Sequence, residues 1–307
     1  MTALIDHRLL VVVGKGGVGR TTVSAALAIA AARLGKRALV LELDQATGLP
    51  PKFDLAPGAS DAPRRGMPGV DVWSLTVPQC LEDFARRKLK LPGFARNLVR
   101  NRFVDTFVDA VPGLHDLMLL GKIENMIREP LPSDPHYDVV ILDAPATGHG
   151  LTLLQAARTL SDITRAGPFH DLARIIDEFL SDRTLTATVL VTLPEELPVQ
   201  EAVELAGALD AEGFRPAAVV ANQVEGRSIP DPPGADEVLA ALAGVEHGAA
   251  LERLVRGEVA RGQRHEQALV DLQARLGPLG GATLLEAPRV EADTVRRVGM
   301  ALAEGLT

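Results

Sequence analysis

The feature that most constrains the fold is a glycine-rich segment, residues 14–22, which directly follows a short apolar run. That run, Leu9–Val13, is rich in β-branched residues and predicts a strand buried on both faces. After the glycines, an alanine-rich stretch predicts a helix from about Thr21 to Leu34. In this context glycines let successive backbone N–H groups converge on phosphate oxygens, helped by the helix N-terminus. The segment therefore predicts a phosphate-binding loop, and the alternative is an ordinary strand-to-helix turn.

The loop follows the pattern G-x-x-x-x-G-K-[ST] at all but one position. Gly14, Gly19 and Thr21 match it, whereas Arg20 stands where the pattern has lysine. A guanidinium also binds phosphate, but it is longer and planar and does not simply replace an ammonium group. We therefore expect nucleotide binding to survive this change more readily than fast hydrolysis. The candidate nucleotide-binding residues of the loop are Gly14, Lys15, Gly16, Gly17, Val18, Gly19, Arg20, Thr21 and Thr22.

Strand-like and helix-like segments alternate along the rest of the chain. The further candidate strands are Ala38–Leu43, Val70–Leu75, Asp138–Leu142, Thr186–Leu193, Pro216–Ala221 and Ala282–Leu285. Helical patterns separate most of them, which predicts an α/β fold with a mostly parallel central sheet flanked by helices. Together with the phosphate loop, this predicts a P-loop NTPase. We expect one ATPase domain over residues 1–307, with a helical subdomain inserted at about 80–130 and 151–182. The Gly- and Pro-rich stretches 48–69 and 229–234 are predicted to be loops.

Charge and composition exclude several classes of protein. The formal net charge of −8 argues against a nucleic-acid partner, because phosphate neutralisation dominates such binding. No apolar run reaches the roughly 18 residues of a membrane span. The N-terminus lacks the basic start of a signal peptide, so we expect a cytoplasmic protein. The single cysteine, Cys80, excludes an internal disulfide and a four-thiolate zinc site.

Four further segments carry a resemblance to a known family. They are Leu43–Ala46, Ile141–His149 (with the sequence Ile-Leu-Asp-Ala-Pro-Ala-Thr-Gly-His), Val191–Glu201 and Val219–Gln223. Together with the phosphate loop, they resemble the arsenite-pump ATPase (ArsA) family, which includes the ATPases that target tail-anchored membrane proteins. The likeness runs from about Leu9 to Leu302 and is greatest to the bacterial members with a single ATPase domain.

The resemblance implies ATP and Mg²⁺ as cofactors. Thr21 would be a Mg²⁺ ligand, Thr22 would contact phosphate, and Asp143 would hold Mg²⁺ through water at the end of its strand. A hard cation beside phosphates favours carboxylate oxygen at this edge of a sheet, which agrees with that role. The alternative for Asp143 is a helix cap at the strand end.

The resemblance also assigns the remaining parts of the site. Asp44 would position the attacking water, and Asn222, followed by Gln223, would contact the adenine edge through its amide. The segment Thr147–His149 would sense the γ-phosphate. The alternatives are a turn aspartate, a turn asparagine and a surface-loop histidine. The family usually has Asp-Pro-Ala-His where this chain has Asp44-Gln45-Ala46-Thr47, so the proline and the histidine of that pattern are absent here.

Lys15 resembles the early lysine of the "deviant" P-loop ATPases, which reaches across a dimer interface to the partner's nucleotide. With Asp44 and Arg20 it forms the candidate catalytic set, and its alternative is an exposed loop lysine. The chain has one phosphate loop, so a composite site needs a second chain. We therefore expect a homodimer or a heterodimer with a paralogous ATPase. A single cysteine rules out the zinc-binding Cys-x-x-Cys of the eukaryotic dimers, and the arsenite-binding cysteines of the pump are missing.

Two stretches of the expected helical subdomain leave alternatives open. Apolar residues recur at helical spacing between Phe103 and Ile127, which fits plain core or a groove for the hydrophobic helix of a membrane-protein client. Exposing six large apolar side chains would cost about 9–18 kcal/mol, which favours core. The basic run from Phe84 to Val104 fits a solvated helix face or a docking site for an acidic partner or anionic lipid.

These observations favour a dimeric ATPase whose conformational switch handles a hydrophobic client or partner. The alternative is a catalytically weak or inactive nucleotide-binding adaptor that pairs with an active paralogue, because of Arg20. A third class, the chromosome-partition or septum-placement ATPases, shares the loop. The Asp143–His149 segment, the helical insertions and a C-terminus with few positive residues count against that class.

Overall fold

The computed structural model describes residues 4–43, 48–87, 111, 113–128, 130, 135–144, 149–225, 234–242, 245, 247–277, 282–288 and 294–306. These residues form an eight-stranded sheet with the order β3-β4-β2-β5-β1-β6-β7-β8. All neighbouring strands are parallel except β3 and β4, as the sequence predicts for a mostly parallel sheet. The strands are β1 (Leu9–Gly14), β2 (Ala38–Leu43), β3 (Arg64–Met67), β4 (Val70–Leu75), β5 (Val139–Asp143), β6 (Thr186–Thr192), β7 (Pro216–Val224) and β8 (Thr283–Pro288).

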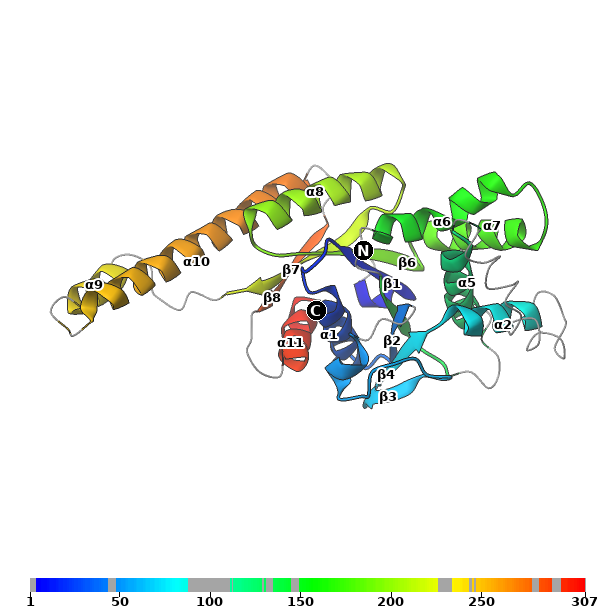
Figure 1. Ribbon diagram of the computed structural model, residues 1–307, viewed down its shortest axis with the longest axis horizontal. Helices are drawn as coiled ribbons and strands as arrows, with labels where there is room; N and C mark the ends of the chain where they lie inside the picture. The colour runs from blue at the N-terminus through cyan, green and yellow to red at the C-terminus, as the bar shows by residue number, and fades with distance from the viewer. Residues whose placement is uncertain are drawn as a thin grey trace.

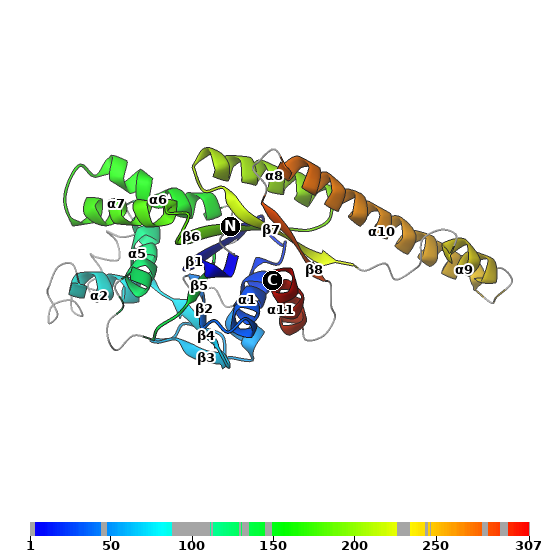
Figure 2. The ribbon, with the colours of Figure 1, turned by 180° about the vertical axis from the view of Figure 1, so that it is seen from behind.

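Helices cover both faces of the sheet (Figure 1). They are α1 (Arg20–Arg33), α2 (Val77–Arg87), α5 (Leu114–Arg128), α6 (His149–Ile163), α7 (Pro168–Ser181), α8 (Glu196–Ala211), α9 (Gly234–Leu242), α10 (Gly248–Leu276) and α11 (Thr294–Gly305), with 3₁₀ turns at Leu4–Asp6 and Pro50–Phe53. Helices α1 and α11 pack together on one face, and the reverse view shows them side by side (Figure 2). Helices α5 to α8 and the C-terminal part of α10 contribute to the core on the other face.

Strand β1 lies at the centre of both cores. Leu9, Val11 and Val13 belong to the core on the α6 and α8 side, whereas Leu10 and Val12 belong to the core on the α1 side. All five residues are fully buried, which confirms the sequence prediction for this strand. Because the strand is covered on both faces, its carboxyl end is a fixed point from which the glycine loop begins.

The prediction of a loop over residues 48–69 is wrong in part. Residues Arg64–Met67 form the edge strand β3, antiparallel to β4. Arg65 lies opposite Asp71 in the ladder, and its Nε is 3.0 Å from Asp71 Oδ1. An edge strand is paired on one side only and needs no alternating apolar pattern, so this arginine-rich segment gave no strand signal.

Helices α2, α5, α6 and α7 gather at one end of the molecule, where α5 contacts each of the other three. Leu117, Leu120 and Ile123 of α5 are fully buried, so the described half of the apolar stretch is core in this structure. The other half, including Phe103, Val104, Phe107 and Val108, lies outside the described residues. Most of the basic run lies outside them as well.

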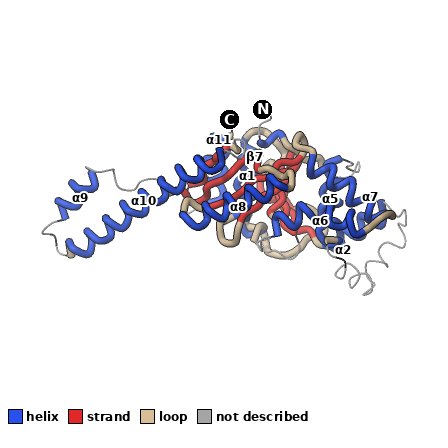
Figure 3. The backbone as a smooth tube through the Cα atoms, turned by 90° about the horizontal axis from the view of Figure 1, so that it is seen from above, coloured by secondary structure: helices blue, strands red, loops and turns tan. Residues whose placement is uncertain are grey.

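At the opposite end, α9 and most of α10 project from the sheet as a hairpin of helices, which we call the arm (Figure 3). The arm is anchored at its base, where Ala268, Leu272 and Leu276 of α10 are buried against the side of the sheet covered by α8. Farther out, Leu254 is 66% exposed. None of the described helices is long and apolar enough to cross a bilayer.

Candidate nucleotide-binding site

The glycine loop leaves the carboxyl end of β1 and enters α1. A Cβ atom at Gly14 would lie 2.6 Å from the backbone oxygen of Val191, so the loop begins where β1 and β6 approach too closely for a side chain. Gly19 is the N-cap of α1 and has the left-handed φ of 85°, a conformation that glycine adopts without strain. The loop is thus tightly packed at Gly14 and left-handed at Gly19, and it leads directly into the N-terminus of α1, the kind of position that binds anions.

Asn222 braces this loop from β7. Its Nδ2 donates a 2.8 Å hydrogen bond to the backbone oxygen of Val18, and the side chain is buried. A Cβ atom at Gly19 would lie 2.2 Å from the same Nδ2. The next residue, Gln223, is exposed and has a positive φ of 59°. In this structure the amide of Asn222 therefore fixes the loop, and its contact with adenine stays a prediction.

Arg20 is the first residue of α1, and its guanidinium is directed toward the end of β5. Its Nη1 donates a 3.2 Å hydrogen bond to the backbone oxygen of Ala144, and the residue is 8% exposed. Burial lowers the pKa of Arg20, and the nearby carboxylate of Asp143 opposes that shift. The arginine that replaces the loop lysine is thus held at the strand that carries the predicted metal-binding carboxylate.

Asp143 ends β5 and faces the first turn of α1. Ser24 Oγ donates a 3.1 Å hydrogen bond to Asp143 Oδ1, and the Thr21 side chain also hydrogen-bonds this carboxylate. Burial raises the pKa of Asp143, whereas these hydrogen bonds and the charge of Arg20 act in the opposite direction. The structure thus brings together the two predicted Mg²⁺ ligands, Thr21 and Asp143.

The donor set fits Mg²⁺ rather than a metal held by protein ligands alone. A hydroxyl and a carboxylate are hard oxygen donors, and Mg²⁺ is commonly held by one or two such groups together with substrate phosphates. Among the described residues, no group of three or more His, Cys, Asp or Glu side chains could hold a metal. Phosphate oxygens of a nucleotide in the loop, together with water, would complete the coordination of Mg²⁺ at this position.

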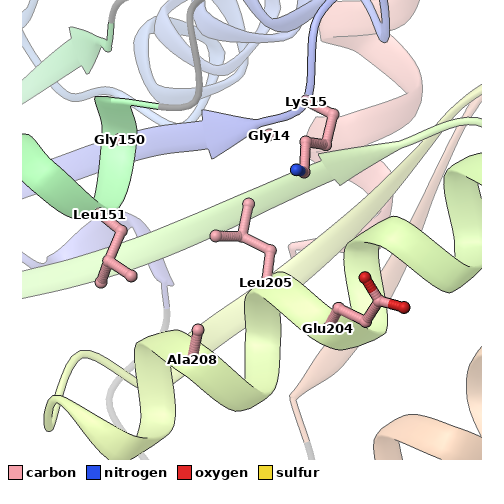
Figure 4. Close-up of a pocket in the computed structure, with 7 residues that line it drawn as sticks. All are labelled: Gly14, Lys15, Gly150, Leu151, Glu204, Leu205 and Ala208. Carbon is pink, nitrogen blue, oxygen red and sulfur yellow. The ribbon is translucent and has the colours of Figure 1, made fainter.

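Lys15 is exposed at the outer side of the loop. It lines a cavity of about 260 Å³ together with Gly14, Gly150 and Leu151 of the α6 side and with Glu204, Leu205 and Ala208 of α8. Figure 4 shows the lysine side chain extending from the loop toward Leu205, with its nitrogen at the cavity. Lys15 is thus set apart from the inward-facing groups Arg20, Thr21 and Asp143.

Some predicted residues cannot be placed. Asp44 and the segment 145–148, which includes Thr147, lie outside the described residues, as does the side chain of His149. Sequence reasoning missed two others. Ser24 follows Thr21 by three residues, so helical spacing alone could have placed it on the same face. Glu42 is a charged residue within an otherwise apolar strand, and that interruption was an available signal.

Comparisons of the sequence with known proteins identify its family. The family model for anion-transporting ATPases, ArsA_ATPase, matches residues 7–168, which include the loop, Thr21 and Asp143. The "ATPase BagA" of Mycobacterium tuberculosis is 33% identical over 204 residues, which cover 64% of this chain and 59% of that protein. The "ATPase ASNA1 homolog 1" of Paramecium tetraurelia is 33% identical over 144 residues, or 46% of this chain and 41% of that protein.

A longer match at lower identity extends the similarity over nearly the whole chain. The "Arsenical pump-driving ATPase" of Acidiphilium multivorum is 26% identical over 312 aligned residues, which cover 95% of this chain and 48% of that protein. The chain thus covers between 41% and 59% of the length of these three relatives.

Proposed function

The chain belongs to the ArsA family of anion-transporting ATPases, and from that premise we propose that it binds and hydrolyses ATP in a dimer. The observation that carries this proposal is the convergence of the glycine loop, Thr21 and Asp143 at the carboxyl end of β1 and β5. In the reaction, a water molecule attacks the γ-phosphate and ADP leaves. Such phosphoryl transfer is catalysed mainly by positioning and by charge stabilisation.

Each part of the site has a role in this reaction. The backbone N–H groups of residues 14–19 bind the phosphates, and Asn222 keeps the loop in shape by its bond to Val18. Thr21 and Asp143 would hold Mg²⁺, which when bound supplies charge neutralisation at the phosphates. Arg20 stabilises phosphate charge, and for this it exchanges its hydrogen bond to Ala144 for one to the nucleotide. Asp44 orients the attacking water.

Lys15 acts on the nucleotide of the second chain. Its exposure to solvent supports this role, because a lysine buried beside Arg20 could serve only its own site. We take the second chain to be an identical copy, and pairing with an active paralogue is the second candidate below. Nucleotide state would then set the shape of the dimer and the handling of a hydrophobic client, such as a helix of a membrane protein.

A second candidate function follows from the hydrogen bond between Arg20 and Ala144. If the guanidinium stays on β5 when nucleotide binds, the protein is a nucleotide-binding adaptor whose catalysis depends on an active paralogue. Both candidates share the same loop and the same bound nucleotide, and they differ in whether this chain alone turns over ATP.

Phosphate release from ATP, measured at steady state on the purified chain, separates the two candidates. We expect turnover in the wild type and a loss of about 10³-fold in Lys15→Ala, the lower end of the range for charge-stabilising fingers in GTPases. Nucleotide binding by Lys15→Ala should stay intact. No turnover in the wild type together with a gain in Arg20→Lys would overturn the ATPase proposal in favour of the adaptor, and normal turnover in Lys15→Ala would overturn the role of Lys15.

A further inference from the structure

Glu42 is a buried carboxylate that the mechanism above does not use. It lies near the carboxyl end of β2 and pairs in parallel register with Asp143 of β5. The residue is 1% exposed. Ser74 Oγ donates a 2.6 Å hydrogen bond to Glu42 Oε1, and the backbone N–H of Leu49 donates a 3.0 Å hydrogen bond to Glu42 Oε2. Each carboxylate oxygen therefore has a donor.

The position of this carboxylate is unfavourable for stability. Burial raises the pKa of Glu42, and the nearby Asp143 adds to that shift. The hydrogen bonds from the Ser74 side chain and from the backbone of Leu49 and Gly48 act against it. Among the residues that the structure describes, no lysine or arginine forms an ion pair with Glu42. A buried charge without a cation destabilises a fold unless its hydrogen bonds compensate. The hydrogen bonds of Glu42 therefore indicate its role.

The bond to Leu49 brings a second part of the chain against the metal site. Leu49 follows Glu42 by seven residues, so the carboxylate holds the returning backbone at the end of its own strand. The residue before it, Gly48, lies beside Thr21, because a Cβ atom at Gly48 would be 3.4 Å from Thr21 Cγ2. Glu42 therefore keeps the Gly48–Leu49 backbone next to the methyl group of the predicted Mg²⁺ ligand.

Thr21 thus has a neighbour on two sides. Its side chain hydrogen-bonds the Asp143 carboxylate, and the Gly48 backbone faces its methyl group with room for one added carbon between them. A threonine has one hydroxyl and one methyl on the same carbon, so a Gly48 backbone that moved closer to the methyl group would turn the hydroxyl as well. Neighbouring strands supply the two carboxylates, Glu42 and Asp143, that set this arrangement.

We propose that Glu42 is a positioning residue of the magnesium site, which acts through the Gly48–Leu49 backbone to fix the Thr21 hydroxyl for metal binding. This inference rests on the proposed function, because it takes Thr21 as a Mg²⁺ ligand. Glu42 itself does not touch metal or nucleotide. Its effect is on the gain in nucleotide affinity that Mg²⁺ provides.

The test uses a fluorescent ADP analogue and measures its Kd in excess Mg²⁺ and in EDTA. The ratio of the two values is the magnesium gain, which needs no hydrolysis. We expect Glu42→Ala to lower this gain by about tenfold, the low end of the effects of outer-shell residues on metal affinity. Glu42→Gln should keep most of the gain, because an amide can accept from Leu49 and donate to Ser74. An unchanged gain in Glu42→Ala, or an equal loss in both variants, would overturn the positioning role.

Two further variants separate positioning from general destabilisation. Asp83 of α2 is another buried carboxylate, 4% exposed and paired with Arg87 and Lys122, and α2 packs on α5 among the helices at one end of the molecule (Figure 1). Asp83→Ala should lower the melting temperature and leave the magnesium gain unchanged, and a loss of gain there would contradict the inference. Gly48→Val leaves Glu42 intact and crowds the Thr21 methyl group, so it should lower the gain as well.

The outcomes distinguish the inference from the function on which it rests. A wild type that binds the ADP analogue equally well with Mg²⁺ and with EDTA would overturn the metal site and the inference together. A wild type with a clear magnesium gain that Glu42→Ala and Gly48→Val both preserve would overturn the inference alone.

Discussion

The glycine loop and the arm are opposite kinds of structure within one chain. In the loop, an added Cβ at Gly14 or Gly19 would meet other atoms at 2.6 and 2.2 Å. In the arm, Gly257 and Gly262 of α10 have nothing within 4 Å of such a Cβ. Asn222 of the loop region is buried and bonded, whereas Leu254 of the arm is 66% exposed.

This difference separates a segment in which the identity of each residue matters from one in which only the helical pattern matters. The loop depends on particular atoms at particular places, so a change of one residue alters both its shape and its chemistry. The outer part of α10 depends mainly on a helical pattern and tolerates exchange at most positions. Its first residue, Gly248, is an exception, because an added Cβ would lie 2.3 Å from the backbone oxygen of Leu242. The base of α10 is buried, so substitutions there should be as costly as those in the loop. The predictions below test that contrast by the free energy of unfolding.

Gly19→Ala should have the largest effect. The new Cβ would force the left-handed backbone of an alanine and displace Asn222 from Val18, at a combined cost of about 4 kcal/mol. Urea denaturation of the purified variant measures this loss. A loss below about 1 kcal/mol, the usual scale of a harmless substitution, would show that the loop is not braced as described.

Leu272→Ala should have the second-largest effect, and it tests whether the base of the arm is packed more tightly than its outer part. Leu272 is fully buried in α10, and its truncation should lower the free energy of unfolding by about 3 kcal/mol. The matched control on the same helix is Leu254→Ala, which should change stability by less than about 0.5 kcal/mol. Equal effects of the two variants in urea denaturation would mean that the arm is packed along its whole length.

Asn222→Ala should have a smaller effect. It leaves the buried oxygen of Val18 without its 2.8 Å hydrogen bond, which costs about 2 kcal/mol. The control is an amide of α10, Gln267, whose Nε2 donates to Asp271 Oδ1 at 2.8 Å on the surface. Thermal unfolding should show Gln267→Ala near the wild type. An equal loss of stability in Asn222→Ala and Gln267→Ala would contradict the expected difference between the buried loop and the exposed surface of α10.

Gly257→Ala and Gly262→Ala should have the smallest effects and the opposite sign. Each site has open space for a methyl group, and alanine is a better helix former than glycine by about 0.5–1 kcal/mol. Differential scanning calorimetry should show both variants with a higher Tm. A lower Tm in either variant would indicate that the arm packs closely against something at that glycine.

Local patterns in the sequence were sufficient for the framework of the fold. The buried run of β1, the loop and α1 are contiguous, and the parallel sheet follows from the alternation of strands and helices. The expected helix from about Thr21 to Leu34 is found as α1, Arg20–Arg33. The edge strand β3 was missed because its four residues, Arg-Arg-Gly-Met, show no apolar alternation.

The contacts within the site could not be predicted in the same way. The bond from Asn222 to Val18 joins residues 204 positions apart, and no local pattern encodes it. The orientation of Arg20 toward Ala144 depends on where β5 lies beside β1, which only the assembled sheet determines. The sequence therefore identified the chemical groups of the site, and the fold determined which of them meet.

Isothermal titration calorimetry with ATP and Mg²⁺ tests the central claim most directly. We expect one nucleotide bound per chain in the wild type and no measurable binding in Gly19→Ala when that variant is folded. An absence of binding heat in folded wild-type protein, at several temperatures and at high ATP concentration, would contradict the account of this loop as a nucleotide site.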